Sequence, residues 1–319
     1  MDLPPLLRAR LDEALAGVNA SELRTAADRL SSRYRGEVLD GRMHLDGDQA
    51  VLAYLAMRLP ATYAAIRMSL DAVTAARPGF MPRTALDLGA GPGTALWALA
   101  DCWPGLEQVT LVEQSQTART WGERLSANAG LAKSEWITGD LSRARSQAAS
   151  GLVILSYVLS EISEPKRGEL VESIWQHAGD TLLIIEPGTS AGWARVMAVR
   201  TQLLELGADI VAPCPHHAPC PLSSPDWCHF ATRVSRSRLH RQLKGGELGW
   251  EDEKFIYLAA SRHAPDNTGP RIIARPNHAK GRVAMKLCMP DGQANETVIS
   301  RRQAELYARA SRANWGDTL

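Results

Sequence analysis

Short apolar runs alternate with segments of helical periodicity through the middle of this 319-residue chain. The runs lie at residues 85–88, 109–112, 136–138, 152–155 and 182–185. Two parallel strands need a long connection between them, and that connection is usually a helix. The alternation therefore predicts an α/β fold with a doubly wound, largely parallel sheet.

The segments on either side of this sheet have different patterns. Before residue 80, apolar residues such as Leu3, Leu7 and Leu11 recur three or four positions apart, which is typical of helices. After the sheet, the apolar runs 255–260 and 283–287 have no long helix between them, so we expect an antiparallel pair that closes the sheet. We divide the chain into an N-terminal helical region (1–79), the α/β core (80–206), a cysteine-rich and basic insertion (207–250), and closing strands with a C-terminal helix (251–319).

A glycine-rich loop follows the first expected strand. Asp87 lies near the end of that strand, and Gly89, Gly91 and Gly93 follow at alternate positions before a helix. Glycine lets the backbone turn sharply and approach a ligand that a Cβ atom would meet. The free amides at the start of the helix, together with the Asp87 carboxylate, predict a site for a polar ligand.

Two more acids follow the next strands. Glu113 ends the second strand, where a carboxylate can accept both hydroxyl protons of a ribose. Asp140 follows the third strand, where an acid can reach the edge of an adenine ring. The Gly-x-Gly-x-Gly spacing differs from that of dinucleotide sites and resembles motif one of class I S-adenosylmethionine methyltransferases. A connecting glycine turn and an NAD site are the alternatives, and the absence of a following Gly-Lys-Ser/Thr excludes a P-loop.

Cys214, Cys220 and Cys228 lie in a stretch rich in proline and histidine, and Cys288 lies 60 residues further on. The prolines exclude a helix or a central strand, so this stretch must be a loop whose shape something fixes. In a reducing compartment a metal or an iron–sulfur cluster does this more often than a disulfide. The chemistry leaves zinc as an alternative to a cluster, since four thiolates suit both. In a zinc site a histidine could replace one cysteine, and the nearby candidates are His216, His217 and His229.

The charge of the chain is unevenly distributed. The net charge is only +1. However, five cations without an intervening acid lie between residues 233 and 244, and they favour binding to a polyanion such as RNA. A solvated helix face is the alternative for this basic run. Its cations are Arg233, Arg236, Arg238, Arg241 and Lys244.

The N-terminal residues lack the features of a targeting sequence. Acids interrupt the apolar positions of residues 1–17, which fits neither a secretory signal nor a transit peptide. No apolar run reaches the roughly 20 residues that span a bilayer. We therefore expect a soluble, cytoplasmic protein.

Several segments together resemble the small-ribosomal-subunit assembly methyltransferase-like family of bacteria and mitochondria. The resemblance covers nearly the whole chain and is carried by residues 54–63, 156–161, 185–189, 214–221, 227–230 and 271–288. It implies a methyltransferase core that binds S-adenosylmethionine, and action on the small ribosomal subunit or its rRNA. It also implies that Cys214, Cys220, Cys228 and Cys288 carry a 4Fe-4S cluster, which we expect to be structural. The fifth cysteine, Cys102, is expected to be a buried apolar residue within a helix.

The residues that would select a methyl acceptor are not evident. The segment 156–161 has no Asn/Asp-Pro-Pro-Tyr motif, and residues 152–164 contain no cysteine nucleophile. Tyr157, Glu161 and Glu186 are the nearest candidates for acceptor contacts. Two functions stay open: an S-adenosylmethionine-dependent rRNA methyltransferase, or an assembly factor that retains the fold and the binding site without catalysis.

Overall fold

The computed structural model describes residues 1–141 and 148–319, and its centre is a mixed sheet of eight strands. The strands are β1 (Thr84–Leu88), β2 (Gln108–Glu113), β3 (Lys133–Thr138), β4 (Ser150–Ser156), β5 (Ala178–Pro187), β6 (Asp209–Ala212), β7 (Phe230–Ser235) and β8 (Trp250–Ser261). Their order is β3-β2-β1-β4-β5-β8-β6, and β7 also pairs with β8. Strands β1 to β5 are mutually parallel, whereas β8 is antiparallel to each of its partners.

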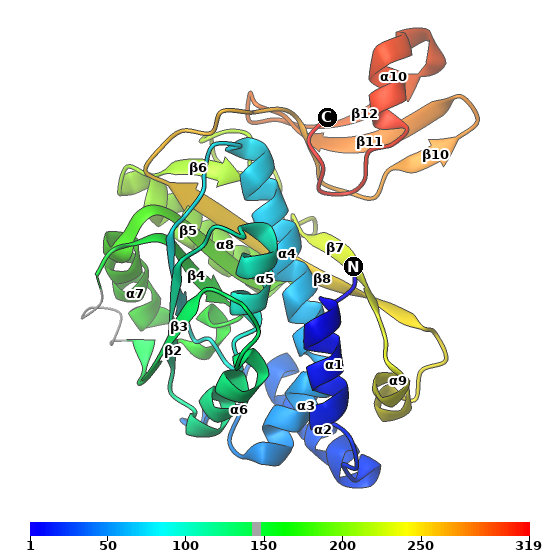
Figure 1. Ribbon diagram of the computed structural model, residues 1–319. Coiled ribbons are helices and arrows are strands. Elements are labelled where there is room, and N and C mark those ends of the chain that lie inside the picture. The colour runs from blue at the N-terminus through cyan, green and yellow to red at the C-terminus, as the bar shows by residue number, and fades with distance from the viewer. Residues whose placement is uncertain (142–147) are drawn as a thin grey trace.

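The helices between these strands cover both faces of the sheet (Figure 1). They are α5 (Thr94–Cys102), α6 (Gln116–Ser126), α7 (Glu164–His177) and α8 (Ser190–Glu205), with a short 3-10 turn, η2, at Leu159–Glu161. The predicted doubly wound α/β sheet is therefore confirmed. The strand order reverses between β1 and β4, and in such sheets ligands bind beyond the carboxyl ends of the strands at this point.

The N-terminal residues form helices that pack against the core. They are α1 (Pro5–Ala14), α2 (Ala20–Arg35), α3 (Asp48–Met57) and α4 (Leu59–Ala76). Helix α2 begins at Asn19, whose side chain accepts a hydrogen bond from the Ser21 amide at 2.9 Å. Helix α4 is buried along most of its length and lies against α5 and β8. None of the described helices is long and apolar enough to cross a membrane.

A second, smaller sheet follows the first (Figure 1). It contains β9 (Arg271–Ile272), β10 (Asn277–Ala279), β11 (Arg282–Cys288) and β12 (Ala294–Ser300). The 3-10 turn η3 (Arg301–Gln303) and helix α10 (Ala304–Ala310) follow β12. This unit has its own apolar core, formed by Ile272, Val283, Met285, Leu287, Ile299 and Ala310.

The expected pairing of residues 255–260 with residues 283–287 is wrong. Strand β8 pairs with β5, β6 and β7, whereas β11 pairs with β9, β10 and β12. The twelve residues of β8 are long enough to pair with three strands. Strand β11 alternates buried and more exposed residues, which suits a sheet covered on one face.

The cysteine-rich segment is more ordered than its sequence indicates. Residues 207–250 contain β6, β7 and α9 (Arg238–Lys244), and the longest irregular stretch is the connection between β6 and β7. The sequence pattern, rich in proline and histidine, does not predict the two short strands β6 and β7. Both strands pair with β8, which lies later in the chain. The division of the chain into four regions stays a prediction.

Candidate functional site

The glycine loop joins β1 to α5 with a left-handed backbone. The φ angles of Gly89, Gly91 and Gly93 are +72°, +54° and +75°, a region that side chains with a Cβ rarely adopt. A Cβ at Gly89 would lie 2.6 Å from Val158 Cγ2, and one at Gly93 would lie 3.1 Å from the Trp136 ring. A side chain at any of the three positions would strain the backbone, and at Gly89 and Gly93 it would also crowd a neighbouring side chain.

Glu113 fixes the loop to the end of β2. Its Oε2 atom accepts a hydrogen bond from the Gly91 amide at 2.7 Å, and its Oε1 atom accepts one from the Ser115 amide at 2.7 Å. Burial raises the pKa of this carboxyl group, although the backbone amides oppose the shift. Because a carboxylate has about four acceptor positions, Glu113 can still bind hydroxyl groups of a ligand.

A cavity of about 630 Å³ opens beyond the carboxyl ends of β1, β2, β3 and β4. Of the predicted ligand residues, Gly89, Gly91, Glu113 and Asp140 line it. Its volume lies within the usual range for small-molecule sites. Gly93 is not part of the lining and instead begins α5.

Asp87 lies behind this lining and is almost completely buried, with 1% exposed. Neither of its carboxylate oxygens has a hydrogen-bond partner among the described residues. Burial and the charge of Glu113 raise the pKa of Asp87 to about 7. A buried carboxyl group without a partner is rare and requires an explanation, such as a water molecule or a cationic ligand.

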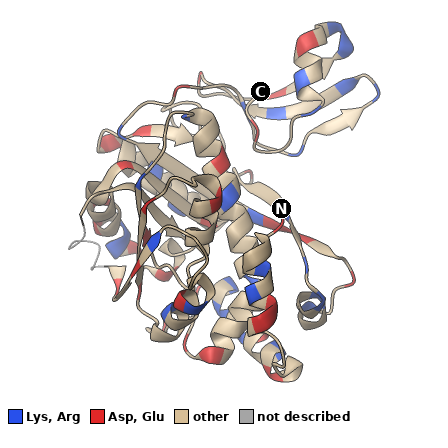
Figure 2. Ribbon diagram, in the orientation of Figure 1, with Lys and Arg blue, Asp and Glu red and all other residues tan. Residues whose placement is uncertain are grey.

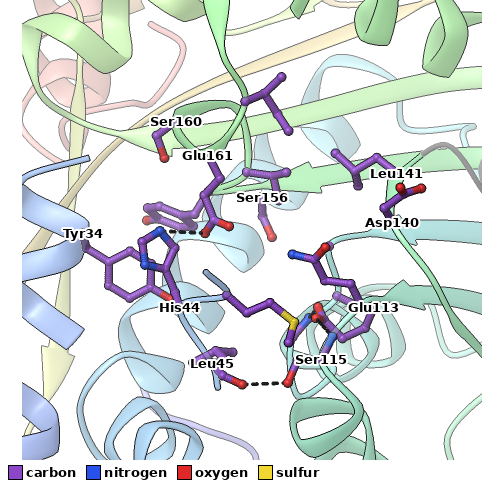
Figure 3. Close-up of a pocket in the computed structure, with 18 of the residues that line it drawn as sticks. Tyr34, His44, Leu45, Glu113, Ser115, Asp140, Leu141, Ser156, Ser160 and Glu161 are labelled. Carbon is purple, nitrogen blue, oxygen red and sulfur yellow. Dashed lines mark hydrogen bonds and ion pairs between the residues drawn. The ribbon is translucent and has the colours of Figure 1, made fainter. Parts of the chain in front are cut away.

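The connection between α2 and α3 forms a wall of the cavity that the sequence did not predict (Figure 3). The Ser115 hydroxyl donates a hydrogen bond to the Leu45 carbonyl at 2.7 Å and holds this connection against β2. His44 packs on Tyr34 with ring centroids 4.9 Å apart, and its Nε2 atom lies 3.8 Å from Glu161 Oε1. No motif marks these residues in the sequence, because only the fold brings them to the cavity.

The three candidate acceptor residues have different surroundings. The Tyr157 hydroxyl donates to Glu253 at 3.0 Å, and Glu186 is fully buried, accepting from the Leu159 amide and from Arg195. Glu161 lines the cavity and lies opposite His44. Burial, then the charges of Glu113 and Glu186, raise the pKa of Glu161 to about 7. Among these three residues, Glu161 is therefore the best placed to exchange a proton with a bound molecule.

A second, smaller cavity lies where the two sheets meet, and we call it the cysteine cavity. It is lined by Cys214, Cys220, Cys228 and Cys288 together with apolar side chains, and none of the four thiols forms a disulfide. Cys214, Cys220 and Cys228 come from the connection between β6 and β7, and Cys288 ends β11. Among the described residues, no three His, Cys, Asp or Glu side chains are close enough to hold a single metal ion.

The three nearby histidines do not contribute equally to this cavity. His216 lines it, with Nε2 3.3 Å from Cys288 Sγ and Nδ1 3.1 Å from the Ala218 carbonyl. His217 and His229 are outside the lining. His217 accepts a hydrogen bond from the Ile210 amide, and His229 stacks on Trp227. Only His216 is therefore placed to replace a cysteine ligand.

Two buried arginines lie beside the cysteine cavity. Arg200 binds the carbonyls of His216 and Ala218, and Arg271 binds those of Pro213 and Gly316. They are 3% and 6% exposed, and no carboxylate of the described chain pairs with either. Burial raises the pKa of the Cys214 thiol, whereas Arg200 and Arg271 lower it. The arginines thus supply positive charge where thiolates would need it.

The basic run is largely neutralised by β8. Arg236 and Lys244 both pair with Glu251, and Arg233 pairs with Asp252 at 3.1 Å. These three cations thus have acidic partners on the adjacent strand, and the RNA contact expected for the basic run stays a prediction. Arg238 and Arg241 are exposed on α9, and the described residues provide no ion pair for either.

The strand order, the single antiparallel strand β8 within the path and the glycine loop after β1 define a class I S-adenosylmethionine-dependent methyltransferase fold. Residues 48–319 match the model of the family described as mitochondrial small ribosomal subunit Rsm22. The chain therefore belongs to this family.

The curated relatives are longer than this chain. The human mitochondrial ribosome assembly protein METTL17 is 29% identical over 292 residues, which cover 84% of this chain and 62% of the relative. A mitochondrial Rsm22-cox11 tandem protein of Schizosaccharomyces pombe is 24% identical, over 85% of this chain and 43% of the relative. Among solved structures, the magnesium protoporphyrin IX methyltransferase of Synechocystis matches 78% of this chain and 99% of its own, with 14% identity and a TM-score of 0.42. Both curated relatives are mitochondrial by name, and the cytoplasmic location expected for this chain stays a prediction.

Proposed function

We propose that this protein binds S-adenosylmethionine in the larger cavity and acts in assembly of the small ribosomal subunit. The family and the names of the relatives support the role in assembly. The observation that best supports S-adenosylmethionine as the ligand is the left-handed glycine loop bound to Glu113 at the carboxyl edge of the sheet. Glu113 would bind the ribose hydroxyls and Asp140 the adenine, while the backbone of Gly89 and Gly91 lines the remainder of the site.

Asp87 supports this assignment through its charge. S-adenosylmethionine has a positively charged sulfur and an ammonium group, and both attract a buried carboxylate. The carboxyl group of Asp87 has no partner among the described residues. Because Asp87 lies behind the lining, it would act on the ligand over a short distance or through a water molecule.

We also propose that Cys214, Cys220, Cys228 and Cys288 hold a 4Fe-4S cluster of structural function. Buried cations without a carboxylate partner are costly, and Arg200 and Arg271 would balance the negative charge of ligated thiolates. Four sulfur atoms around one zinc ion lie within about 4 Å of one another, given Zn–S bonds of about 2.3 Å. The described side chains have no such close grouping, and zinc remains the alternative that metal analysis must separate from a cluster.

Methyl transfer is a second candidate function, favoured by the position of Glu161. Bound S-adenosylmethionine would supply an electrophilic methyl group. The acceptor atom would form a bond to the methyl carbon, the carbon–sulfur bond would break with its electrons passing to sulfur, and Glu161 would take the acceptor's proton. With a pKa near 7, this carboxyl group is partly ionised at neutral pH and can accept a proton. The alternative remains an assembly factor without catalysis.

Three measurements on the intact protein test these proposals. Calorimetry with S-adenosylmethionine should detect binding, and no binding would contradict the first proposal. Iron and sulfide analysis after anaerobic purification should give four of each per chain; stoichiometric zinc in a colourless protein would contradict the cluster. Incubation with immature small subunits and methyl-labelled S-adenosylmethionine separates the candidates, because rRNA without label despite ligand binding excludes methyl transfer to rRNA.

A further inference from the structure

The C-terminal segment that forms the second sheet is strongly basic. Residues 271–319 contain nine Lys and Arg against four Asp and Glu. Some of these cations have partners: Arg271 binds backbone carbonyls, Arg275 pairs with Asp252, and Lys286 pairs with Asp226. The others are exposed, and four of them lie close in the fold. We call this group the basic tip, and its members are Lys280, Arg282, Arg301 and Arg302.

Strand pairing brings these four residues to one end of the second sheet. Arg282 begins β11 and lies opposite Ser300, the last residue of β12. The Arg301 amide donates a hydrogen bond to the Gly281 carbonyl at 3.0 Å, so the β10–β11 turn and the end of β12 are held together. A Cβ at Gly281 would lie 3.6 Å from Arg301 Cδ, which places the Arg301 side chain across the turn. The basic tip is thus a feature of the fold and not only of the sequence.

The cations of the basic tip differ from those of residues 233–244 in having no acidic partner. All four are exposed, and the described residues form no ion pair or side-chain hydrogen bond with any of them. Figure 2 shows cations along the strands of the second sheet, which stands apart from the larger one. Like charges held close together repel one another, so this arrangement favours an external polyanion.

We propose that the basic tip is a contact surface for RNA, through phosphate groups. This inference rests on the proposed role in small-subunit assembly and names where the rRNA would bind. In the described part of this unit, Tyr307 packs against the core, and His278 on β10 is exposed beside β11. The four cations of the basic tip would contact phosphate groups, so the interaction would be mainly electrostatic and tolerant of sequence.

Strand β11 links this surface to the cysteine cavity. Arg282 and Cys288 are its first and last residues, so they are separated by about 20 Å along one strand. A ligand held by the cysteines would fix one end of β11 and thereby the orientation of the basic tip. This connection assigns the cysteines a task that does not require redox chemistry.

Matched double variants test the proposal. Arg282→Gln with Arg302→Gln removes two charges from the tip, and Arg238→Gln with Arg241→Gln removes two exposed charges from α9. All four residues are exposed, so neither variant should affect folding. The affinity for a labelled mixed-sequence RNA and for purified small-subunit rRNA is measured over a series of salt concentrations.

We expect the tip variant to bind RNA about tenfold more weakly at physiological salt, with the salt slope reduced by about 1.5, since each phosphate contact contributes about 0.7 to 0.9. The α9 variant should retain parental affinity. Equal affinity of the tip variant and the parent, or a loss confined to the α9 variant, overturns the inference.

Co-sedimentation with small subunits separates this inference from the proposed function. If the parent protein does not bind immature subunits, the proposed function fails. If the parent binds and the tip variant binds equally well, only the role of the tip fails. A third outcome is that the parent stays bound to subunits after RNase treatment while the tip variant does not bind. This outcome would indicate an acidic protein as the partner and would overturn the RNA assignment.

Discussion

The two cavities of this protein are built in different ways. The larger cavity lies beyond strands of one sheet, and the Glu113 carboxylate accepts hydrogen bonds from the Gly91 and Ser115 amides without involvement of a ligand. The cysteine cavity is assembled from the β6–β7 connection and from the end of β11, which belongs to another sheet. Apart from apolar contacts, few interactions hold its thiols in place. The first site is thus a product of the fold, whereas under the proposed cluster the second would need its ligand to complete the fold.

This difference predicts opposite responses to loss of a ligand. Removal of S-adenosylmethionine should leave the larger sheet intact, because pairing between its own strands holds it together. Removal of a cluster would leave buried thiols, together with two buried arginines that lack an anionic partner. We therefore expect the junction between the sheets to depend on its ligand for stability.

The largest effect is expected for a cysteine ligand. Cys288→Ser should abolish the bound iron and lower the unfolding free energy by about 4 kcal/mol or more, the scale of losing a structural metal site. Limited proteolysis should then cleave the connections around residues 262–270 faster. Iron content and denaturant unfolding measure these effects.

The matched control is Cys102→Ala, since Cys102 lies in α5 outside the cysteine cavity. Its iron content should equal that of the parent protein. Full iron content in Cys288→Ser would show that the two sheets do not share a ligand. The cysteine cavity would then depend on a ligand for its stability no more than the larger cavity does.

An intermediate effect is expected in the glycine loop. Gly89→Ala places a Cβ 2.6 Å from Val158 and forces a positive φ on alanine, so the loop must shift. S-adenosylmethionine affinity should fall about tenfold or more, and the unfolding free energy should fall by about 1–2 kcal/mol. Iron content should stay unchanged, because this cavity is separate from the cysteines.

Gly105→Ala is the corresponding control, because a Cβ there meets no atom within 4 Å and its φ is not positive. Calorimetry on both variants measures the change. If Gly89→Ala binds S-adenosylmethionine as tightly as the parent protein does, the glycine loop is not part of the binding site.

The smallest effect is expected for Asp87→Asn and depends on pH. The pKa of Asp87 is about 7 in the folded protein, above the ordinary value of about 3.9. The folded state therefore binds more protons than the unfolded state between these values, and its stability falls as the pH rises through them. Without ligand, the variant should be more stable than the parent by about 1–2 kcal/mol at pH 8, with a smaller difference at pH 5.

The same variant should bind S-adenosylmethionine more weakly, since an amide does not attract its positive charge. Asp12→Asn, at an exposed position of α1, should change neither property. A variant that is less stable than the parent at pH 8 would show that Asp87 has a favourable partner in the protein alone.

Local patterns account for what the sequence could predict. The strands β1, β2, β4 and β5 are largely apolar because helices cover both faces, and the glycine loop has a fixed relation to the first of them. Strands β6 and β12 were missed: β6 is short and adjoins a proline-rich stretch, and β12 has mostly polar, exposed residues. Their strand conformation comes from pairing with β8 and β11, which no local pattern shows.

The candidate sites show the same limit. The four cysteines and the acids after β2 and β3 could be named from spacing and from the family resemblance, although their binding of ligands stays a prediction. His44, Leu45, Arg200 and Arg271 could not be named, because each reaches its site through tertiary packing. The acids that neutralise the basic run lie on β8, the next strand in the chain. Only the register between β7 and β8 shows that these acids face the cations.

The wall formed by the connection between α2 and α3 lies outside the part of the chain that matches the family, which begins at residue 48. The Ser115 hydroxyl holds this wall through the Leu45 carbonyl, a backbone group that every residue has, so a different side chain at position 45 leaves that attachment in place. A substitution at His44 changes the group that faces Glu161 across the cavity and leaves the glycine loop and the cysteines as they are. What enters the cavity can thus be adjusted at this connection separately from the residues that would hold the ligand.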